Sequence, residues 1–361
     1  MARDLAVSSR RAFLRSSLAV AGAAVLVNAC GSDGSSALRF ANWQDYIDPE
    51  LLEIYRRTTG RRVSYSTYAS NDELADRLAL AGVSRRRGRK PEQYDLIVPS
   101  DSLFRELLNQ DRLAKLDTSI VTTALLGNLD MAVYTDPKWA AYGIPWATGM
   151  TGIGYDSDVF DEPPTWSVFA DVAYEGKATL LDEMREAFSA AFFDLGEDPN
   201  TTDVATIEAA TQRLTEFAAV VEFDSKTYLD RLQSGDIVVA QAFNTDVLQA
   251  KEKRPSLEFV VPESGGTLWT DLLAIPADAA RERDANRFVA FMLDPTNAAR
   301  NAEYLSVNTA NVAAVATLPD EFTSDPAVFP DDVTRSHLAR IVPASGAAAT
   351  AFDSGWSSVT S

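Results

Sequence analysis

Gly265-Gly266-Thr267-Leu268-Trp269-Thr270-Asp271-Leu272-Leu273-Ala274-Ile275-Pro276 is the stretch that decides the fold of this chain. Two glycines allow an unusual backbone entry and a proline closes the run, so the stretch predicts one buried β-strand. Side chains alternate along a strand, which places Trp269 and Asp271 on the same face. An unpaired buried charge is costly, but an aromatic ring beside a carboxylate suits a bound cation. Alternatively, Trp269 belongs to the core and Asp271 meets a backbone amide or an arginine.

The first 29 residues predict a targeting segment, to be set aside before fold analysis. Arg10 and Arg11 lie in a pattern typical of twin-arginine export, followed by an apolar run over 18–27 that is too short to span a bilayer. Cys30 ends a stretch similar to a lipobox, where the signal is cut and the new N-terminal cysteine is lipidated. We therefore expect a twin-arginine lipoprotein signal peptide over 1–29. The alternative is a chance arginine pair before an uncleaved anchor.

Residues 30–37 would then form a lipidated tether that holds the protein to a membrane outside the cytoplasm. Cys30 is the only cysteine and His337 the only histidine, which excludes Cys/His zinc sites and Ser-His-Asp or Cys-His catalysis. The whole chain has a formal net charge of −19, and removing residues 1–29, with four arginines and one aspartate, makes it −22. Such acidity argues against nucleic acid and favours cationic ligands.

The first part of the mature chain alternates strands with helices. The strands are expected at 38–41, 63–67 and 94–100, and the helices at 49–59, from 70 onward and at 101–110. Alternation of this kind predicts a parallel, doubly wound sheet. Ligands of such sheets bind beyond the carboxyl ends of the strands, where residues 42–46 and Ser100 lie.

A second region begins near Tyr142. Its glycines at 149, 152 and 154 lack the Lys-Ser/Thr of a phosphate loop, so a closely packed crossover strand is the better interpretation. Further helices are expected at 182–193, 204–221, 228–233 and 279–293, and further strands at 237–243 and 257–261.

Glu183 and Glu186 stand three apart on the expected helix 182–193, which places them on one helix face. Three interpretations are open. The pair is the solvated acidic start of a helix, or it awaits a cation, or it is the carboxylate pair of a glycosidase. The third fits poorly, because the two acids of a glycosidase normally come from different elements.

Four motifs occur in order along the chain. They are Asn-Trp-Gln-Asp-Tyr-Ile from residue 42, Tyr-Asp-Leu-Ile-Val-Pro-Ser from residue 94, Asp-Glu-Met-Arg-Glu-Ala-Phe from residue 182, and the stretch from residue 265. In these the chain resembles the spermidine/putrescine-binding proteins of polyamine ABC transporters, from about residue 38 to 356. The resemblance implies a type II periplasmic binding protein fold of two α/β lobes, each a mostly parallel sheet with helices on both faces.

The resemblance implies lobe 1 over 38–144 plus 270–317, lobe 2 over 145–269 plus 318–361, and a ligand cleft between them. It also implies ligand-binding roles for nine residues. Phe243 stands where the family often has Trp, and Glu183 where it typically has Asp. The nine residues are Trp43, Asp45, Tyr46, Ser100, Glu183, Glu186, Phe243, Trp269 and Asp271.

The function implied is capture of a polyamine and its delivery to the permease of an ABC importer, without catalysis, cofactor or metal. We expect a monomer that binds no nucleic acid and contacts the membrane only through its lipid. There are enough acids among these residues to pair with three nitrogens. We therefore expect a spermidine-like amine rather than a short diamine. Alternatives are another organic cation, an amino sugar or ferric iron. The alternative of a different class is a carboxylate-dependent enzyme such as a glycosidase.

Overall fold

The computed structural model describes residues 37–68, 70–79, 92–123, 126–127 and 137–361. Arg10, Arg11, Cys30 and the basic loop at 85–90 lie outside the described residues, so the export and lipidation signals stay predictions. Within the part that is described, no helix is long and apolar enough to cross a bilayer.

The elements within 38–144 and 270–317, here called the first lobe, alternate between strand and helix at the start. They are β1 (Leu38–Trp43), α1 (Pro49–Thr59), β2 (Val63–Tyr68), α2 (Asn71–Arg77), β3 (Leu96–Ile97), α3 (Asp101–Asn109), α4 (Pro137–Ala140), α9 (Glu282–Met292), α10 (Pro295–Leu305) and α11 (Val312–Val315).

The elements within 145–269 and 318–361, here called the second lobe, follow the same alternation. They are the 3₁₀ turns Trp166–Ala170 and Val172–Tyr174, β5 (Ala178–Leu180), α5 (Met184–Leu195), α6 (Val204–Ala218), β6 (Glu222–Phe223), α7 (Tyr228–Ser234), β7 (Val239–Phe243), α8 (Asn244–Lys251), β8 (Leu257–Val260), α12 (Asp320–Thr323), α13 (Asp332–Ser336), β10 (Leu338–Ala339) and α14 (Gly346–Val359).

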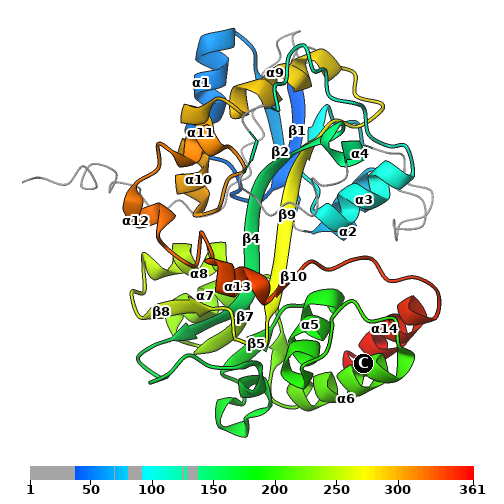
Figure 1. Ribbon diagram of the computed structural model, residues 1–361, viewed down its shortest axis with the longest axis vertical. Helices are drawn as coiled ribbons and strands as arrows, with labels where there is room; N and C mark the ends of the chain where they lie inside the picture. The colour runs from blue at the N-terminus through cyan, green and yellow to red at the C-terminus, as the bar shows by residue number, and fades with distance from the viewer. Residues whose placement is uncertain (1–36, 69, 80–91, 124–125, 128–136) are drawn as a thin grey trace, which may run out of the picture. The chain divides into compact units, whose positions relative to one another are not determined.

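Two long strands, β4 (Gly143–Asp156) and β9 (Gly266–Ala274), lie side by side (Figure 1). β4 crosses the expected lobe boundary at 144/145 and β9 the one at 269/270. The strand order is β2-β1-β3-β9-β4-β7-β5-β6, with β10 beside β9 and β8 beside β4. β1 pairs in parallel with β2 and β3, and β5 pairs in parallel with β6 and β7. The pairs that join these two groups, β3·β9, β9·β4 and β4·β7, are antiparallel. The predicted fold of two mostly parallel α/β lobes is confirmed.

Separate groups of apolar side chains are buried in the two lobes. In the first lobe Phe40 of β1 packs with Leu51 of α1 and Phe288 of α9. In the second lobe Phe188 of α5 contacts Phe352 of α14, and α6 packs against both helices. Burial of one such ring stabilises the fold by roughly 1.5–3 kcal/mol.

Most predicted elements occur within a few residues of their expected ends, and α1 shows why. Asp48 caps its first turn by accepting a hydrogen bond from the Glu50 amide at 2.9 Å, and Pro49 occupies its first position. Gly60 ends it with φ 70°, a left-handed conformation that favours glycine.

Three predicted boundaries were wrong. The strand expected at 94–100 is only β3, because Pro99 has no amide hydrogen and Ser100 already occupies the position before α3. The helix expected from 279 begins at Glu282, because Ala279 is in a turn bonded to the Pro276 carbonyl. α5 begins at Met184 and not at 182, so Glu183 precedes the helix.

Candidate functional site

The first group of predicted site residues lies in the turn of residues 43–47, directly after β1. Asn42 is fully buried and holds this turn, since its Nδ2 donates to the Tyr46 carbonyl at 2.8 Å and its Oδ1 accepts from the Trp43 amide at 2.9 Å. The Trp43 indole donates to the Val98 carbonyl at 2.8 Å, which fixes the ring. Asp45 is exposed at the tip with φ 51°.

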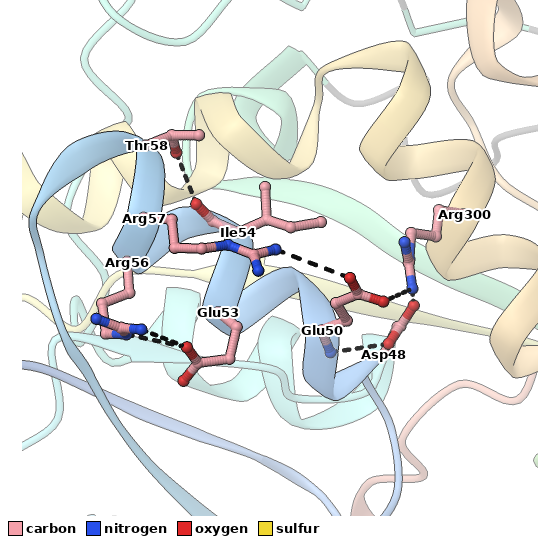
Figure 2. A network of polar contacts seen from close by, with 8 residues as sticks. All are labelled: Asp48, Glu50, Glu53, Ile54, Arg56, Arg57, Thr58 and Arg300. Atoms are coloured by element: carbon pink, nitrogen blue, oxygen red, sulfur yellow. Dashed lines mark hydrogen bonds and ion pairs between the residues drawn. The ribbon is translucent and has the colours of Figure 1, made fainter. Parts of the chain in front are cut away.

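A polar network at the start of α1 fixes the far end of the same turn (Figure 2). Arg300 of α10 donates to Asp48 and, at 2.6 Å, to Glu50. The Asp48 amide donates to Asn301 Oδ1 at 3.0 Å. The turn is therefore held from β1 on one side and from α10 on the other.

Asp271 of β9 lies against this turn. The residue is only 6% exposed, and its carboxylate accepts a hydrogen bond from the Tyr46 hydroxyl at 2.7 Å. Burial raises the pKa of Asp271 to about 7, with the negative charges of Asp101 and Glu183 adding to the rise and the Tyr46 hydroxyl opposing it. Burial and the Asp271 charge raise the pKa of Tyr46, so its proton stays on the phenol.

Ser100 joins the same group through the backbone and through two side chains. It forms a β-bridge with Asp271, and its Oγ accepts from Asn71 Nδ2 at 2.5 Å and lies 3.2 Å from Ser102 Oγ. The structure thus brings Tyr46, Ser100 and Asp271 together, although 225 residues separate the tyrosine from the aspartate.

Trp269 and Phe243 form an aromatic pair on β9 and β7. Their ring centroids are 5.9 Å apart and their planes are nearly perpendicular, at 89°. Trp269 is half-buried, and its indole nitrogen has no hydrogen-bond partner among the residues that the structure describes. The ring lies on Gly149 of β4, where an added Cβ would be only 2.2 Å from Trp269 Cζ2. Glycine at 149 is therefore required by this ring position.

Glu186, in the first turn of α5, accepts from the Thr267 hydroxyl at 3.0 and 3.2 Å. Thr267 is an even number of residues from Trp269 and Asp271, so all three share one face of β9. Burial raises the pKa of Glu186 to about 8, and the charge of Glu183 contributes to this rise. Among the described residues, Glu186 meets no arginine or lysine in an ion pair.

The prediction that Glu183 and Glu186 lie within one helix was wrong. Glu183 is the residue before α5, with extended backbone at φ −135°, because the chain still runs out from β5 there. Its side chain keeps contact with water, yet the surrounding protein raises its pKa to about 7, helped by the charges of Asp72 and Asp182. Asp72 belongs to α2, so acids of both lobes influence one another.

The sequence interpretation missed Asp246, in the first turn of α8. It accepts a hydrogen bond from the Tyr228 hydroxyl, and its charge raises the pKa of Tyr46 across the lobes. Burial raises the pKa of Asp246 itself, which the Tyr228 hydrogen bond opposes. Its position after the carboxyl end of β7 matches that of Ser100 after β3, and this signal could have identified it.

Asp45 and the main recess in the described part of the chain both lie apart from the group around Asp271. Asp45 faces solvent and influences Tyr65 and Tyr304 of the first lobe rather than Asp271. A recess lies elsewhere, between β4, β9, α9 and α10, and none of the nine predicted residues lines it.

The arrangement combines buried carboxylates, aromatic rings and neutral hydroxyl donors. The structural interpretation of Asp271 offered a backbone amide or an arginine as its partner. Both were wrong, because the partner is the Tyr46 hydroxyl. Trp269 is likewise only half-buried rather than a core residue. Hydroxyl donors satisfy the oxygens without neutralising the charge, so the site can accept cations.

Curated relatives cover most of the chain. The spermidine/putrescine-binding periplasmic protein of Salmonella typhimurium is 33% identical over 326 residues, which are 88% of this chain and 90% of the relative. That of Escherichia coli is 33% identical over 324 residues, with the same shares. A putrescine/cadaverine-binding protein of Pseudomonas aeruginosa is 29% identical, over 88% of this chain and 91% of its own length.

Solved structures agree. A spermidine/putrescine ABC transporter protein from Listeria monocytogenes matches with a TM-score of 0.79 and 28% identity, over 90% of this chain and 99% of that one. The spermidine/putrescine substrate-binding protein of Streptococcus pneumoniae matches with a TM-score of 0.75 and 27% identity, over 90% and 98%. The family of bacterial extracellular solute-binding proteins matches residues 50–330. This chain is therefore a bacterial extracellular solute-binding protein.

Proposed function

We propose that this protein captures a polyamine of the spermidine/putrescine class outside the cytoplasm and delivers it to an ABC importer. The observation that carries the proposal is the pairing of Asp271 with Trp269 on one face of β9. Among the described residues, this buried carboxylate accepts from a tyrosine hydroxyl and forms no ion pair with arginine or lysine. An ammonium group would supply the missing charge.

The proposed ligand-binding residues divide by their chemistry. Methylenes of the ligand would lie against the rings, where burial stabilises by about 25 cal/mol per Å². Ammonium groups would meet the acids of both lobes, and the neutral hydroxyls would orient them. The rings are Trp43, Phe243 and Trp269, the acids are Asp45, Glu183, Glu186, Asp246 and Asp271, and the hydroxyls are Tyr46 and Ser100.

The spread of the acids favours a long cation over a metal ion. Among the described residues, no group of three or more His, Cys, Asp or Glu side chains is placed to hold one metal ion. Asp271 is on β9, Glu186 on α5 and Asp246 on α8, so several separate charges suit several nitrogens. We propose a three-nitrogen, spermidine-like amine ahead of a diamine.

The lobes would close around this ligand, with boundaries at 144/145, 269/270 and 317/318. Closure follows if the ligand binds acids of both lobes and so has a higher affinity for the closed arrangement. The importer permease would then recognise the closed protein. We propose that the protein acts as a monomer and catalyses no reaction.

A thermal-shift screen followed by titration calorimetry tests this function on the full chain. A tight amine at a thousandfold excess over its Kd should stabilise the protein by about 4 kcal/mol. Putrescine, spermidine and spermine are compared in one buffer with an amino sugar and ferric iron. Stabilisation by the sugar or iron but by no amine would overturn the proposal, and chemical conversion of an amine would make the protein an enzyme.

We further propose export through Arg10 and Arg11 and membrane anchoring through a lipid on Cys30. Replacing both arginines with lysine should leave the protein in the cytoplasm, and Cys30→Ser should abolish lipid labelling. Palmitate label retained on Cys30→Ser would contradict the anchor, and export of the double lysine variant would contradict the twin-arginine route.

A further inference from the structure

The segment of residues 340–345, here called the C-terminal strap, connects β10 to α14. Side chains of the second lobe fasten it. Arg185 Nη1 donates to the Val342 carbonyl at 3.2 Å, and Asn200 Nδ2 donates to the Arg340 carbonyl at 2.8 Å. Asn200 Oδ1 also accepts from the Val342 amide at 2.9 Å. The backbone of the strap is therefore part of the second lobe.

The Arg340 side chain leaves this lobe and reaches the first one. Its Nη1 is 3.2 Å from Asp101 Oδ2 and 3.1 Å from Thr270 Oγ1. Asp101 is the first residue of α3, directly after Ser100 of the proposed site. The two charged side chains are only 13% and 11% exposed, so water weakens this pair less than a surface pair.

This pair differs from the rest by the lobes that it joins. By the proposed boundaries, every other ion pair between two described residues lies within one lobe. Arg340 and Asp101 connect the second lobe to the first.

Arg340 approaches β9 from the face opposite the proposed ligand. Side chains alternate along a strand, so Thr270 faces away from its neighbours Trp269 and Asp271. Its hydroxyl accordingly lies 3.1 Å from that of Thr148 on β4. A ligand held by Trp269 and Asp271 would therefore not touch Arg340.

The acids of the two lobes oppose this arrangement when no ligand is present. The charge of Asp72 in the first lobe raises the pKa of Glu183 in the second, and the charge of Glu183 raises the pKa of Asp271 in the first. Like charges held at such range repel. An attraction between the same lobes, placed behind the site, offsets part of this repulsion.

We propose that Arg340 is a positioning residue that ties the lobes, through Asp101, in the arrangement that binds ligand. The inference rests on the proposed function. A tie of this kind raises the population of the binding-competent arrangement. It therefore increases the affinity for every ligand by the same factor. A residue that touched the ligand would strengthen some amines more than others.

Titration calorimetry tests whether Arg340→Gln lowers the affinities for putrescine and spermidine by the same factor. Both affinities should fall about five- to tenfold, with their ratio unchanged. Asp101→Asn should give the same loss, and the double variant should lose no more than either single one, as in a double-mutant cycle of a contacting pair. Arg340→Lys, which keeps the charge and is the milder change, should restore part of the loss.

Arg335→Gln is the matched control, because Arg335 pairs with exposed Asp332 of the same helix and its loss changes the net charge equally. It should leave both affinities unchanged. A changed ratio of the two amines in Arg340→Gln would place Arg340 in contact with the ligand and overturn the proposal. So would unchanged affinities, or additive losses in the double variant.

Small-angle X-ray scattering of the ligand-free proteins provides a second test that needs no amine. Arg340→Gln and Asp101→Asn should each increase the radius of gyration, and Arg335→Gln should not. Equal radii in all four proteins would refute the tie. If the wild-type protein bound no amine, the proposed function would fall while the scattering result still decided on the tie.

Discussion

Two kinds of carboxylate, buried or half-buried, occur in the described part of this molecule, and they differ in their partners. Asp95, directly before β3, accepts from the Arg39 guanidinium at 3.0 and 3.2 Å and from the Arg39 amide at 2.9 Å. Burial alone raises the pKa of Asp95, but the Arg39 bonds and charge outweigh it and the pKa is lowered. Asp271 and Glu186 have hydroxyl partners instead, and their pKa values are raised to about 7 and about 8.

The difference separates acids that hold the fold from acids that await a ligand. An acid matched to an arginine is stabilised as the carboxylate, and losing either partner destabilises the protein. An acid matched only to hydroxyls remains costly to bury as the carboxylate, and a cation from outside can remove that cost. Asp156 with Arg254 belongs to the first kind.

Asp271→Asn should have the largest effect on binding. It removes the charge and keeps the shape, so the affinity for the amine should fall by about 2–4 kcal/mol, as for a desolvated charge pair. The melting temperature of the ligand-free protein should stay the same or rise, because repulsion from Asp101 and Glu183 is relieved. Calorimetry and thermal unfolding measure the two effects. Unchanged affinity would return Asp271 to a structural role.

The pH dependence follows from the same acids. Below their raised pKa values of about 7 to 8, Glu183, Glu186 and Asp271 hold protons that the ammonium groups must displace. Each acid that meets an ammonium group should therefore lower the affinity about ten- to fiftyfold from pH 8 to pH 6, with protons released on binding. Calorimetry in buffers of different ionisation heat measures that release. A constant affinity across this range would mean that these acids are already ionised.

The stability of the ligand-free protein should change in the opposite sense. The unfolded pKa values of these acids lie near 4, below the folded ones, so their contribution to stability is full below pH 4 and is lost as the pH rises through 7 to 8. Asp95 affects stability at low pH. Because its pKa is lowered in the folded protein, stability should fall as the pH drops below about 4.

Asp95→Asn should have the converse effect to Asp271→Asn. The free energy of unfolding should fall by about 2–3 kcal/mol, because Arg39 loses its partner but remains partly solvated. The affinity for the amine, measured on the folded fraction, should not change. Denaturant unfolding gives the first quantity. A loss of affinity without a loss of stability would erase the distinction between the two kinds of acid.

Gly149→Ala should have a smaller effect, confined to the aromatic side of the site. The new methyl group would displace the Trp269 ring, so the affinity should fall by about 1 kcal/mol with little change in the pH profile. Gly60→Ala is an informative contrast, because φ 70° strains the helix end but no atom lies within 4 Å. It should lower stability only, by about 1 kcal/mol.

Much of the fold could be predicted from local pattern, because alternation and capping residues act over a few positions. The face shared by Trp269 and Asp271 follows from strand geometry alone. The hydroxyl partner of Asp271 could not be predicted, because Tyr46 reaches it only after distant strands have paired. Asp246 and Arg340 were missed for the same reason, since neither stands in a pattern that distinguishes it from a surface charge. The predicted start of α5 was wrong because Glu183 suits a helix terminus as well as a helix interior.

The ladder between β4 and β9 contains one irregular step. Pro145 pairs with Leu272 and Ala147 with Asp271, which leaves Trp146 as an extra residue on β4. Pro145 has no amide hydrogen, so the ladder loses a bond at the expected lobe boundary. In mechanical terms, the β4–β9 pair should bend most easily at this step. Amide exchange should therefore be faster at Trp146 than at Thr148, and the bending of β4 against β9 should depend on the stiffness of this one bulge beside the proposed ammonium site.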